Sequence, residues 1–347
     1  MTIKYTVKWK KTNFSNIIDV RSPAEFKEDH IPGSINLPVL NNEQRVRIGT
    51  IYKKESPFKA KKIGASLVSN NISKHLKKDL ISKPGNWKPL IYCWRGGQRS
   101  KALATVLSEI GWQVTVLKGG YKTYRSSINN EINKLTRTSR FIVLKGPTGC
   151  AKTKILELLK KQGLSVLNLE ELAAHKGSLL GNIPNKKQPS QKLFESKIFS
   201  SLNDLKDKKK IFIESESSKI GKLFLPQIVL NKIKTSQAIE IYANLDQRIK
   251  FLLHDYSKYI REENSFLELF KHAKNKVSSK TINNWLKLYK NKNWYKLAHY
   301  LIVDYYDPLY THNLNNKKNQ IIDTYNLSSL TNKSLKRFCI TLESNFK

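Results

Sequence analysis

A lone cysteine stands between an apolar run and a segment of helical periodicity in the stretch IYCWRGGQRSKALATVL, residues 91–107. Residues 89–93 are expected to form a buried strand, and residues 100–110 a helix. Cys93 then lies at the carboxyl end of a strand, which is where open α/β sheets bind their ligands. The alternative is a buried, inert cysteine at a strand end, and the pattern C-x-R-G-G-x-R-S that begins at Cys93 favours the reactive one.

The residues between that strand and helix could stabilise a negative charge on the sulfur of Cys93. Their backbone N–H groups can surround the sulfur because Gly96 and Gly97 permit positive φ, while Arg95 and Arg99 add positive charge. A thiolate in such a place is a nucleophile, and the same groups would hold a terminal sulfur or selenium anion bound to Cys93. The expected active-site loop consists of the catalytic Cys93 followed by Trp94, Arg95, Gly96, Gly97, Gln98, Arg99 and Ser100.

A second loop, GPTGCAKT at residues 146–153, follows an expected strand and precedes an expected helix. It matches the phosphate-binding pattern G-x-x-x-x-G-K-[ST], in which N–H groups, a lysine and a hydroxyl hold a phosphate and Mg²⁺, except that Ala151 replaces the second glycine. If this position requires positive φ, the alanine costs about 1–3 kcal/mol and weakens phosphate binding. The alternative is a plain strand-to-helix turn. The expected phosphate-binding residues are Gly146, Gly149, Lys152 and Thr153.

Two carboxylates, Glu214 and Glu216, follow the expected strand at 210–213 and are candidate ligands for Mg²⁺. The alternative is that they are solvated, since acidic residues often follow strands. Cys150, inside the second loop, is expected to be a small filler.

Strands alternate with helices around these loops in two blocks. Strands are expected at 16–20, 89–93, 113–117, 139–144 and 210–213, and helices from 23 and over 100–110 and 152–162. A polar stretch at 126–140 separates the blocks. The alternation predicts an α/β fold with mostly parallel sheets, divided into one domain at 1–130 and a second at 139–347 that is mainly helical from about residue 245.

The composition narrows the class of protein. The chain has 347 residues, enough for two domains, 39% of them hydrophobic, with no apolar run long enough to span a bilayer. Three scattered cysteines and the lack of a secretion signal predict a cytoplasmic protein with no membrane partner. The net charge of +36 favours a nucleic acid as partner over a lysine-rich surface that is merely solvated.

The Cys93 loop resembles the active-site loop of the rhodanese family. DVRSPAEF at 19–26 and HIPGSIN at 30–36 resemble the family's first signature, and LKGGYKTY at 117–124 resembles its closing one. The resemblance covers residues 5–125 and implies a rhodanese-like domain. It also implies that four residues support turns and do not touch sulfur, namely Asp19, Arg21, Glu25 and His30.

A rhodanese-like domain followed by a P-loop NTPase-like domain resembles the tRNA 2-selenouridine synthase family over most of the chain. Further stretches specific to that family lie at 46–52, 56–64, 169–178, 188–191, 214–221 and 305–310, with Phe194 and Glu195. Two residues depart from the family pattern. One is Ala151, and the other is Lys176, which stands where an arginine is expected and replaces a bidentate phosphate contact by a point charge.

The resemblance implies a transferase acting on the wobble uridine of tRNAs that carry 2-thiouridine in the anticodon region. The sulfur is first geranylated from geranyl diphosphate, and selenium from selenophosphate then replaces it. No tightly bound cofactor is expected, and Mg²⁺ is the candidate metal. Cys93 would carry the selenium, and the second loop would bind diphosphate or selenophosphate. The enzyme that produces selenophosphate is a candidate partner. Aromatic residues proposed to stack on anticodon bases, with core positions as the alternative, are Trp285, Trp294, Tyr305 and Tyr306.

Two other functions stay open on the sequence. One is a general sulfurtransferase with an appended ATPase, which would turn over thiosulfate and cyanide without RNA. The other is a non-catalytic RNA-binding protein with two degenerate domains. The intact C-x-R-G-G-x-R-S loop argues against the second alternative, whereas Ala151 argues for it.

Overall fold

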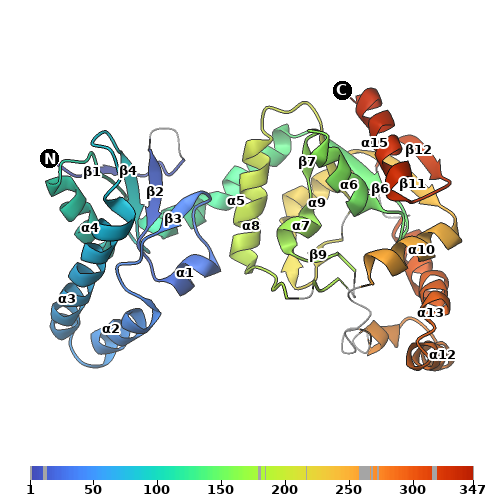
Figure 1. Cartoon of the computed structure of the whole chain (residues 1–347), viewed down its shortest axis with the longest axis horizontal. Coiled ribbons are helices and arrows are strands. Elements are labelled where there is room, and N and C mark those ends of the chain that lie inside the picture. Colours follow the sequence, from blue (N-terminus) through green and yellow to red (C-terminus); the bar gives the residue numbers. More distant parts are fainter. Residues whose placement is uncertain are drawn as a thin grey trace. The chain divides into compact units, whose positions relative to one another are not determined.

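The computed structural model, drawn in Figure 1, describes residues 2–10, 14–178, 181–183, 185–215, 217–257, 266, 269–271, 273–314 and 319–346. The chain divides into two compact units, one made of Met1–Glu131 with Glu195–Lys197 and the other of Ile132–Phe194 with Ile198–Lys347. Among the described residues, no helix combines the length and the apolar character needed to cross a membrane.

The first unit alternates strands and helices in the order β1 (Lys4–Thr6), β2 (Asn16–Asp19), α1 (Pro23–Glu28), β3 (Ser34–Asn36), α2 (Asn42–Lys54), α3 (Pro57–His75), the π-helix η1 (Leu76–Leu80), β4 (Pro89–Tyr92), α4 (Gln98–Glu109), β5 (Thr115–Leu117) and the start of α5 (Gly120–Thr138). Its strands form one parallel sheet in the order β1-β5-β4-β2-β3. The central strand β4 is buried along its whole length, as a strand covered on both faces must be. The three strands expected in this part of the sequence are confirmed.

A helix runs through the polar stretch that was expected to separate the two blocks. Residues 126–140 have few apolar side chains, yet α5 runs through most of them. Tyr124, Ile128, Ile132 and Thr136 are buried at four-residue spacing, which gives the helix one continuous buried stripe. The division between the two compact units, after Glu131, falls within this helix.

The second unit contains β6 (Phe141–Lys145), α6 (Lys152–Lys161), β7 (Val166–Leu167), α7 (Leu169–Ala173), α8 (Gln191–Asp204), β8 (Ile211–Glu214), β9 (Lys219–Ile220), β10 (Leu223–Phe224), α9 (Gln227–Thr235), β11 (Gln237–Ala243), α10 (Leu245–Asp255), α12 (Ser279–Lys290), α13 (Trp294–Leu301), the π-helix η2 (Ile302–Tyr306), α14 (Asp307–Leu314), β12 (Ile321–Leu327) and α15 (Asn332–Phe346). Its main sheet is parallel, in the order β12-β11-β6-β8-β7, and β9 pairs with β10 as a separate antiparallel ribbon. The strands expected at 139–144 and 210–213 and the helix expected at 152–162 are confirmed. The α/β architecture with parallel sheets is therefore confirmed for both units.

The C-terminal region is mainly helical, as expected, but it also supplies the edge strand β12. This strand pairs in parallel with β11 although none of its residues is fully buried. Its half-exposed pattern lacks the continuous apolar run that marks the central strands. The sequence therefore gave no strong strand signal there.

A buried ion pair fixes the turn after β2. Arg21 Nη2 donates to Asp19 Oδ2 at 2.6 Å and to the carbonyl oxygen of Asp29 at 2.7 Å, and both charged side chains are at most 1% exposed. The guanidinium also lies over the ring of Tyr121, 4.1 Å from its centroid. These contacts fit the supporting role expected for Asp19 and Arg21.

Removing one partner of this pair should destabilise the first unit strongly. Asp19→Ala leaves a buried guanidinium without its carboxylate, so we expect the free energy of unfolding to fall by about 3–5 kcal/mol. The control is Glu55→Ala, which breaks an exposed pair with Lys59 and should cost about 0–1 kcal/mol. Urea denaturation followed by tryptophan fluorescence compares the two, and equal losses would contradict this account of the turn.

Candidate functional site

The Cys93 loop joins β4 to α4 and brings hydrogen-bond donors to the sulfur. Cys93 Sγ accepts the backbone N–H of Gly97 at 3.2 Å and lies 3.3 Å from Ser100 Oγ, which itself bonds to the carbonyl oxygen of Gly97 at 3.0 Å. The cysteine is 4% exposed and precedes the first turn of α4. Negative charge on this sulfur would be stabilised by the N–H group and by the positive end of the helix.

Close backbone packing holds this loop in shape. Gly96 has φ +66° and Gly120 has φ +58°, and a Cβ added to Gly120 would lie 2.2 Å from the carbonyl oxygen of Cys93. That carbonyl accepts the N–H of Tyr121 at 2.8 Å. Gly97 differs from the expectation, because its φ of −93° makes it an ordinary N-cap residue of α4. Only the first of the two loop glycines needs the left-handed region.

The two arginines expected beside the sulfur have different surroundings. Arg99 Nη1 donates to Glu25 Oε2 at 2.7 Å, and Arg45 Nε lies 3.8 Å from the same carboxylate oxygen. Burial raises the pKa of Glu25, but the hydrogen bond and charge of Arg99 outweigh it and hold the pKa below its ordinary value. The charge of Arg99 is therefore shared with a carboxylate, whereas Arg95 is exposed.

The remaining predicted residues lie around this loop. Trp94 is 37% exposed and packs at 5.2 Å against the Tyr121 ring, and Gln98 is exposed at the start of α4. His30 contacts Phe26 of α1. Its Nδ1 bonds to the carbonyl oxygen of Phe26 at 2.8 Å, and its ring stacks on Phe26 at 3.9 Å.

The second loop connects β6 to α6 and forms one end of a cavity. Lys152 Nζ donates to the carbonyl oxygens of Gly146 at 2.7 Å and Pro147 at 3.1 Å, which keeps its ammonium group within the curl of the loop. Gly146 and Gly149 both have positive φ, and Gly149 also packs against Arg248. Ala151 has φ +58°. Position 151 therefore does adopt positive φ, and the alanine there is in the strained conformation.

Arg248, on α10, holds this loop by a hydrogen bond to its backbone. Its Nε donates to the carbonyl oxygen of Thr148 at 2.8 Å, and its Nη1 donates to Asp307 Oδ2 at 2.9 Å. Arg248 is only 6% exposed, so its charge depends on these partners. Sequence reasoning missed it because no motif surrounds it. Asp307 lay in the stretch 305–310, which was noted without a role.

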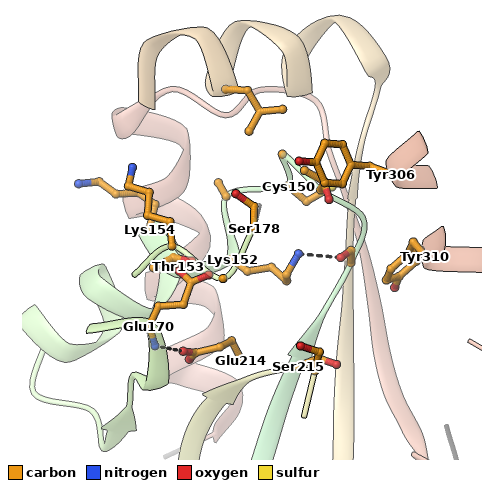
Figure 2. A pocket seen from close by; sticks show the side chains of 18 of the residues that line it. Cys150, Lys152, Thr153, Lys154, Glu170, Ser178, Glu214, Ser215, Tyr306 and Tyr310 are labelled. Atoms are coloured by element: carbon orange, nitrogen blue, oxygen red, sulfur yellow. Dashed lines mark hydrogen bonds between the residues drawn. The ribbon is translucent and has the colours of Figure 1, made fainter. Parts of the chain in front are cut away.

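Two carboxylates lie beside the loop hydroxyl. Thr153 Oγ1 donates to Glu170 Oε2 at 2.7 Å, and Glu214 Oε1 accepts the backbone N–H of Glu170 at 2.9 Å (Figure 2). Burial raises the pKa of Glu170, although Thr153 and Lys152 act in the opposite direction. Such oxygen donors are those that Mg²⁺ prefers. Glu170 was missed by the sequence reasoning, although it lies in the stretch 169–178 noted above.

Of the two predicted metal ligands, the structure describes one. Glu214 lines the cavity, whereas Glu216 lies outside the described residues. Among the residues described, no group of three or more histidine, cysteine, aspartate or glutamate side chains could hold a metal ion. A Mg²⁺ ion would therefore need oxygen atoms of its substrate and water to complete its shell.

The cavity above the loop measures about 770 Å³ and has two kinds of wall. The loop supplies the polar end, with Lys176 and Ser178 nearby. Figure 2 shows Lys152 between Thr153 and the tyrosines in this view. The apolar and aromatic lining comes from α9, α10, η2 and α14 and consists of Leu230, Phe251, Leu252, Tyr256, Tyr306, Leu309 and Tyr310. The arrangement can bind an anionic group at one end and an apolar group at the other.

Lys176 and Cys150 complete the cavity. Lys176 Nζ donates to Asp255 Oδ2 at 2.6 Å and lies 4.9 Å from the centroid of the Tyr256 ring. A carboxylate and an aromatic ring thus hold the charge that replaces the expected arginine. Burial raises the pKa of the Cys150 thiol despite Lys152 and Arg248, which suits the filler role expected for it.

The aromatic residues considered for base stacking are mostly in the core. Trp285 is 0% and Tyr305 is 5% exposed, and both belong to the cluster formed by α12, α13 and η2, with Trp294 packed against it. Tyr306 lines the cavity. The core alternative therefore holds for Trp285 and Tyr305, and Tyr306 faces the cavity of the second unit.

Position 151 offers a direct test of backbone strain. Ala151→Gly should relieve about 1–3 kcal/mol of strain, offset by about 0.8 kcal/mol for a lost methyl and by about 0.4–1 kcal/mol of chain entropy. We expect a small net change in stability and unimpaired affinity for inorganic pyrophosphate. Ala151→Val is the control, because a β-branched residue at this φ should destabilise the unit. Denaturation and calorimetric titration measure both, and equal tolerance of valine would contradict the strained geometry.

Two family models match this chain, in the order expected from the sequence. The model of the Rhodanese-like domain matches residues 3–127, and that of the tRNA 2-selenouridine synthase AAA domain matches residues 139–287.

Relatives named tRNA 2-selenouridine synthase include one from Nitrosomonas europaea, 32% identical over 69% of this chain, and one from Bdellovibrio bacteriovorus, 34% identical over 69% of it. The chain spans 63% and 64% of the length of these two proteins. A relative of the same name from Shewanella halifaxensis is 31% identical, and the match covers 88% of this chain and 90% of that protein. On this match, and with both domain models in the expected order, the chain belongs to the tRNA 2-selenouridine synthase family.

Proposed function

We propose that this chain is a tRNA-modifying transferase that replaces the sulfur of wobble 2-thiouridine with selenium from selenophosphate, by way of an S-geranylated intermediate. The observation that carries the proposal is the cavity of the second unit, where a phosphate-type loop faces a wall of apolar and aromatic side chains. Its volume of about 770 Å³ lies within the roughly 300–1,000 Å³ of small-molecule sites. The first unit adds a thiol whose sulfur accepts the backbone N–H of Gly97.

Geranyl diphosphate suits both ends of this cavity. Its diphosphate would lie on the loop with Lys152, and its isoprenoid chain along the wall that includes Phe251, Tyr306 and Leu309. The thiocarbonyl sulfur attacks C1 of the geranyl group while the C1–O bond breaks, and the diphosphate leaves with that electron pair. Lys152 and the first N–H groups of α6 stabilise the charge on the leaving group. A Mg²⁺ ion held with Thr153, Glu170 and Glu214 would supply further neutralisation of that charge.

The selenium step conserves electrons overall. Selenium from selenophosphate bonds to C2 of the uridine, geranyl thiolate leaves with the C–S electron pair, and water takes up the phosphoryl group as phosphate. Carriage of selenium on Cys93 as an S–Se⁻ group adds one oxidation and one reduction, which leave the overall electron count unchanged. A small disulfide accepts two electrons when the S–Se bond forms, and the corresponding thiol returns them when selenium passes to the uridine. The Gly97 N–H, 3.2 Å from Sγ, would stabilise the carried anion.

The P-loop lysine separates geranyl transfer from tRNA binding. Lys152→Ala removes the mobile charge of the loop and should lower geranyl transfer by roughly 10²–10³-fold, as loss of one stabilising donor does elsewhere. The affinity for tRNA should hardly change, because 62 of the 63 basic residues remain. Lys160→Ala is the matched control, since Lys160 is exposed on the same helix and pairs with Glu171. Mass spectrometry of geranylated nucleosides measures the effect, and unchanged geranylation in Lys152→Ala would show that the loop has no part in the reaction.

Cys93 should be required for selenium transfer alone. Cys93→Ser keeps the size of the side chain, but an alkoxide forms far less readily near neutral pH than a thiolate and cannot form the S–Se bond. We expect no selenouridine and an accumulation of geranylated tRNA. Cys339→Ala, which removes a buried thiol of the second unit, should leave both activities in place.

Both nucleosides are quantified in the same tRNA digest. Continued selenouridine formation by Cys93→Ser, or loss of both activities in a folded protein, would falsify this division of labour. Turnover of thiosulfate and cyanide without RNA, together with no change in tRNA, would favour the general sulfurtransferase instead.

A further inference from the structure

The helices α2 and α3 form a hairpin inserted between β3 and β4, and they lie side by side in the first unit (Figure 1). Ile51, Ala60 and Gly64 are buried along the hairpin, and a Cβ on Gly64 would lie 3.7 Å from the side chain of Ile48. Further along α3, Ile72 joins the core under the sheet. The hairpin is therefore a packed part of this unit. Its sequence contains the stretches 46–52 and 56–64, which have no role in the chemistry proposed for either loop.

Three large apolar side chains of the hairpin are exposed to solvent. Phe58 is 74% exposed, Val46 is 68% exposed and Tyr52 is 54% exposed. Tyr52 lies in the last turn of α2, and Phe58 lies in the first turn of α3. Both residues therefore flank the short connection between the two helices. Exposed apolar side chains that form one contiguous patch are typical of a contact surface.

The hairpin is also strongly basic. Residues 42–80 contain ten lysines and arginines against three acidic residues. Of these acids, Glu55 pairs with Lys59 and Asp79 with His75. The exposed lysines around the turn are Lys53, Lys54, Lys59, Lys61 and Lys62. Lysines interleaved with exposed aromatic rings are the combination that binds single-stranded nucleic acid, by phosphate contacts and by stacking of bases.

The hairpin also adjoins the sulfur loop within the same unit. Arg45 of α2 lies 3.8 Å from the Glu25 carboxylate, and the same carboxylate holds Arg99 of the Cys93 loop at 2.7 Å. Tyr52 follows Arg45 by seven residues, which is about 10 Å along a helix axis. A nucleotide at Cys93 would therefore have neighbours within reach of the hairpin.

We propose that the exposed face of this hairpin, from Val46 to Lys62, is the docking surface for the anticodon arm of the tRNA substrate. Its lysines contact phosphates, and Tyr52 and Phe58 stack on unpaired bases next to the one being modified. The inference rests on the proposed function, because it assumes that a wobble base is presented to Cys93.

The test measures binding of a fluorescently labelled tRNA carrying 2-thiouridine to the full chain over a series of salt concentrations. Tyr52→Ala with Phe58→Ala should weaken binding at least about tenfold, as loss of base stacking does. Phe58→Trp preserves an aromatic face and should bind like the unaltered chain. Lys61→Glu with Lys62→Glu should weaken binding and reduce the slope of log affinity against log salt by about 2. The matched control is Lys208→Glu with Lys209→Glu, which makes the same change in net charge at exposed positions of the second unit.

The outcomes separate this inference from the proposed function. Weaker binding in the two hairpin variants, with the control and Phe58→Trp unaffected, supports the docking surface. If the unaltered chain converts 2-thiouridine but the hairpin variants bind as tightly as the control, the docking surface is overturned and the proposed function stands. Unchanged tRNA binding with loss of selenium delivery from the selenophosphate-producing enzyme would assign the hairpin to a protein partner and would also overturn the inference. No tRNA binding by the unaltered chain would overturn both.

Discussion

Both candidate loops depend on one constraint of parallel α/β sheets, which is that a chain leaving a buried strand must turn within a few residues into a helix. The first N–H groups of that helix have no partner inside it. In the first unit, the N–H of Gly97 meets the sulfur of Cys93 at 3.2 Å. In the second, the start of α6 lines the cavity with Lys152 and Thr153. Backbone geometry thus provides N–H groups that suit an anion at two places before any charged side chain is counted.

The same tight turns restrict which residues can occupy them. Gly120 is 27 positions away from Cys93 in the sequence, yet a side chain there would collide with the carbonyl oxygen of Cys93. This explains why a glycine pair after β5 accompanies the cysteine loop. Ala151 meets the same demand less well, because an alanine at φ +58° is strained where a glycine is not. The first loop therefore obeys the constraint fully, and the second obeys it at a cost in stability.

Features set by neighbouring residues in the sequence could be predicted, and those set by distant partners could not. The buried strands β2, β4, β6 and β8 carry continuous apolar runs, and both loops carry their residues at fixed spacing, so each was predictable. Glu170 and Arg248 act through partners 17 and 100 positions away, Thr153 and Thr148, which no local pattern reveals. The edge strand β12 is defined by its pairing with β11, which no local pattern reveals either.

The apolar wall and the phosphate loop of the second unit are joined through Arg248. This side chain bonds to the carbonyl oxygen of Thr148 in the loop and to Asp307, the residue directly after Tyr306 in the wall. Separating the buried guanidinium from Asp307 would leave a charge unpaired, at a cost of about 3–5 kcal/mol. The loop and the wall are therefore held in one fixed relation. For the diphosphate substrate proposed above, an apolar chain seated on the wall would reach the loop at a set distance, so the chain and the diphosphate are recognised together.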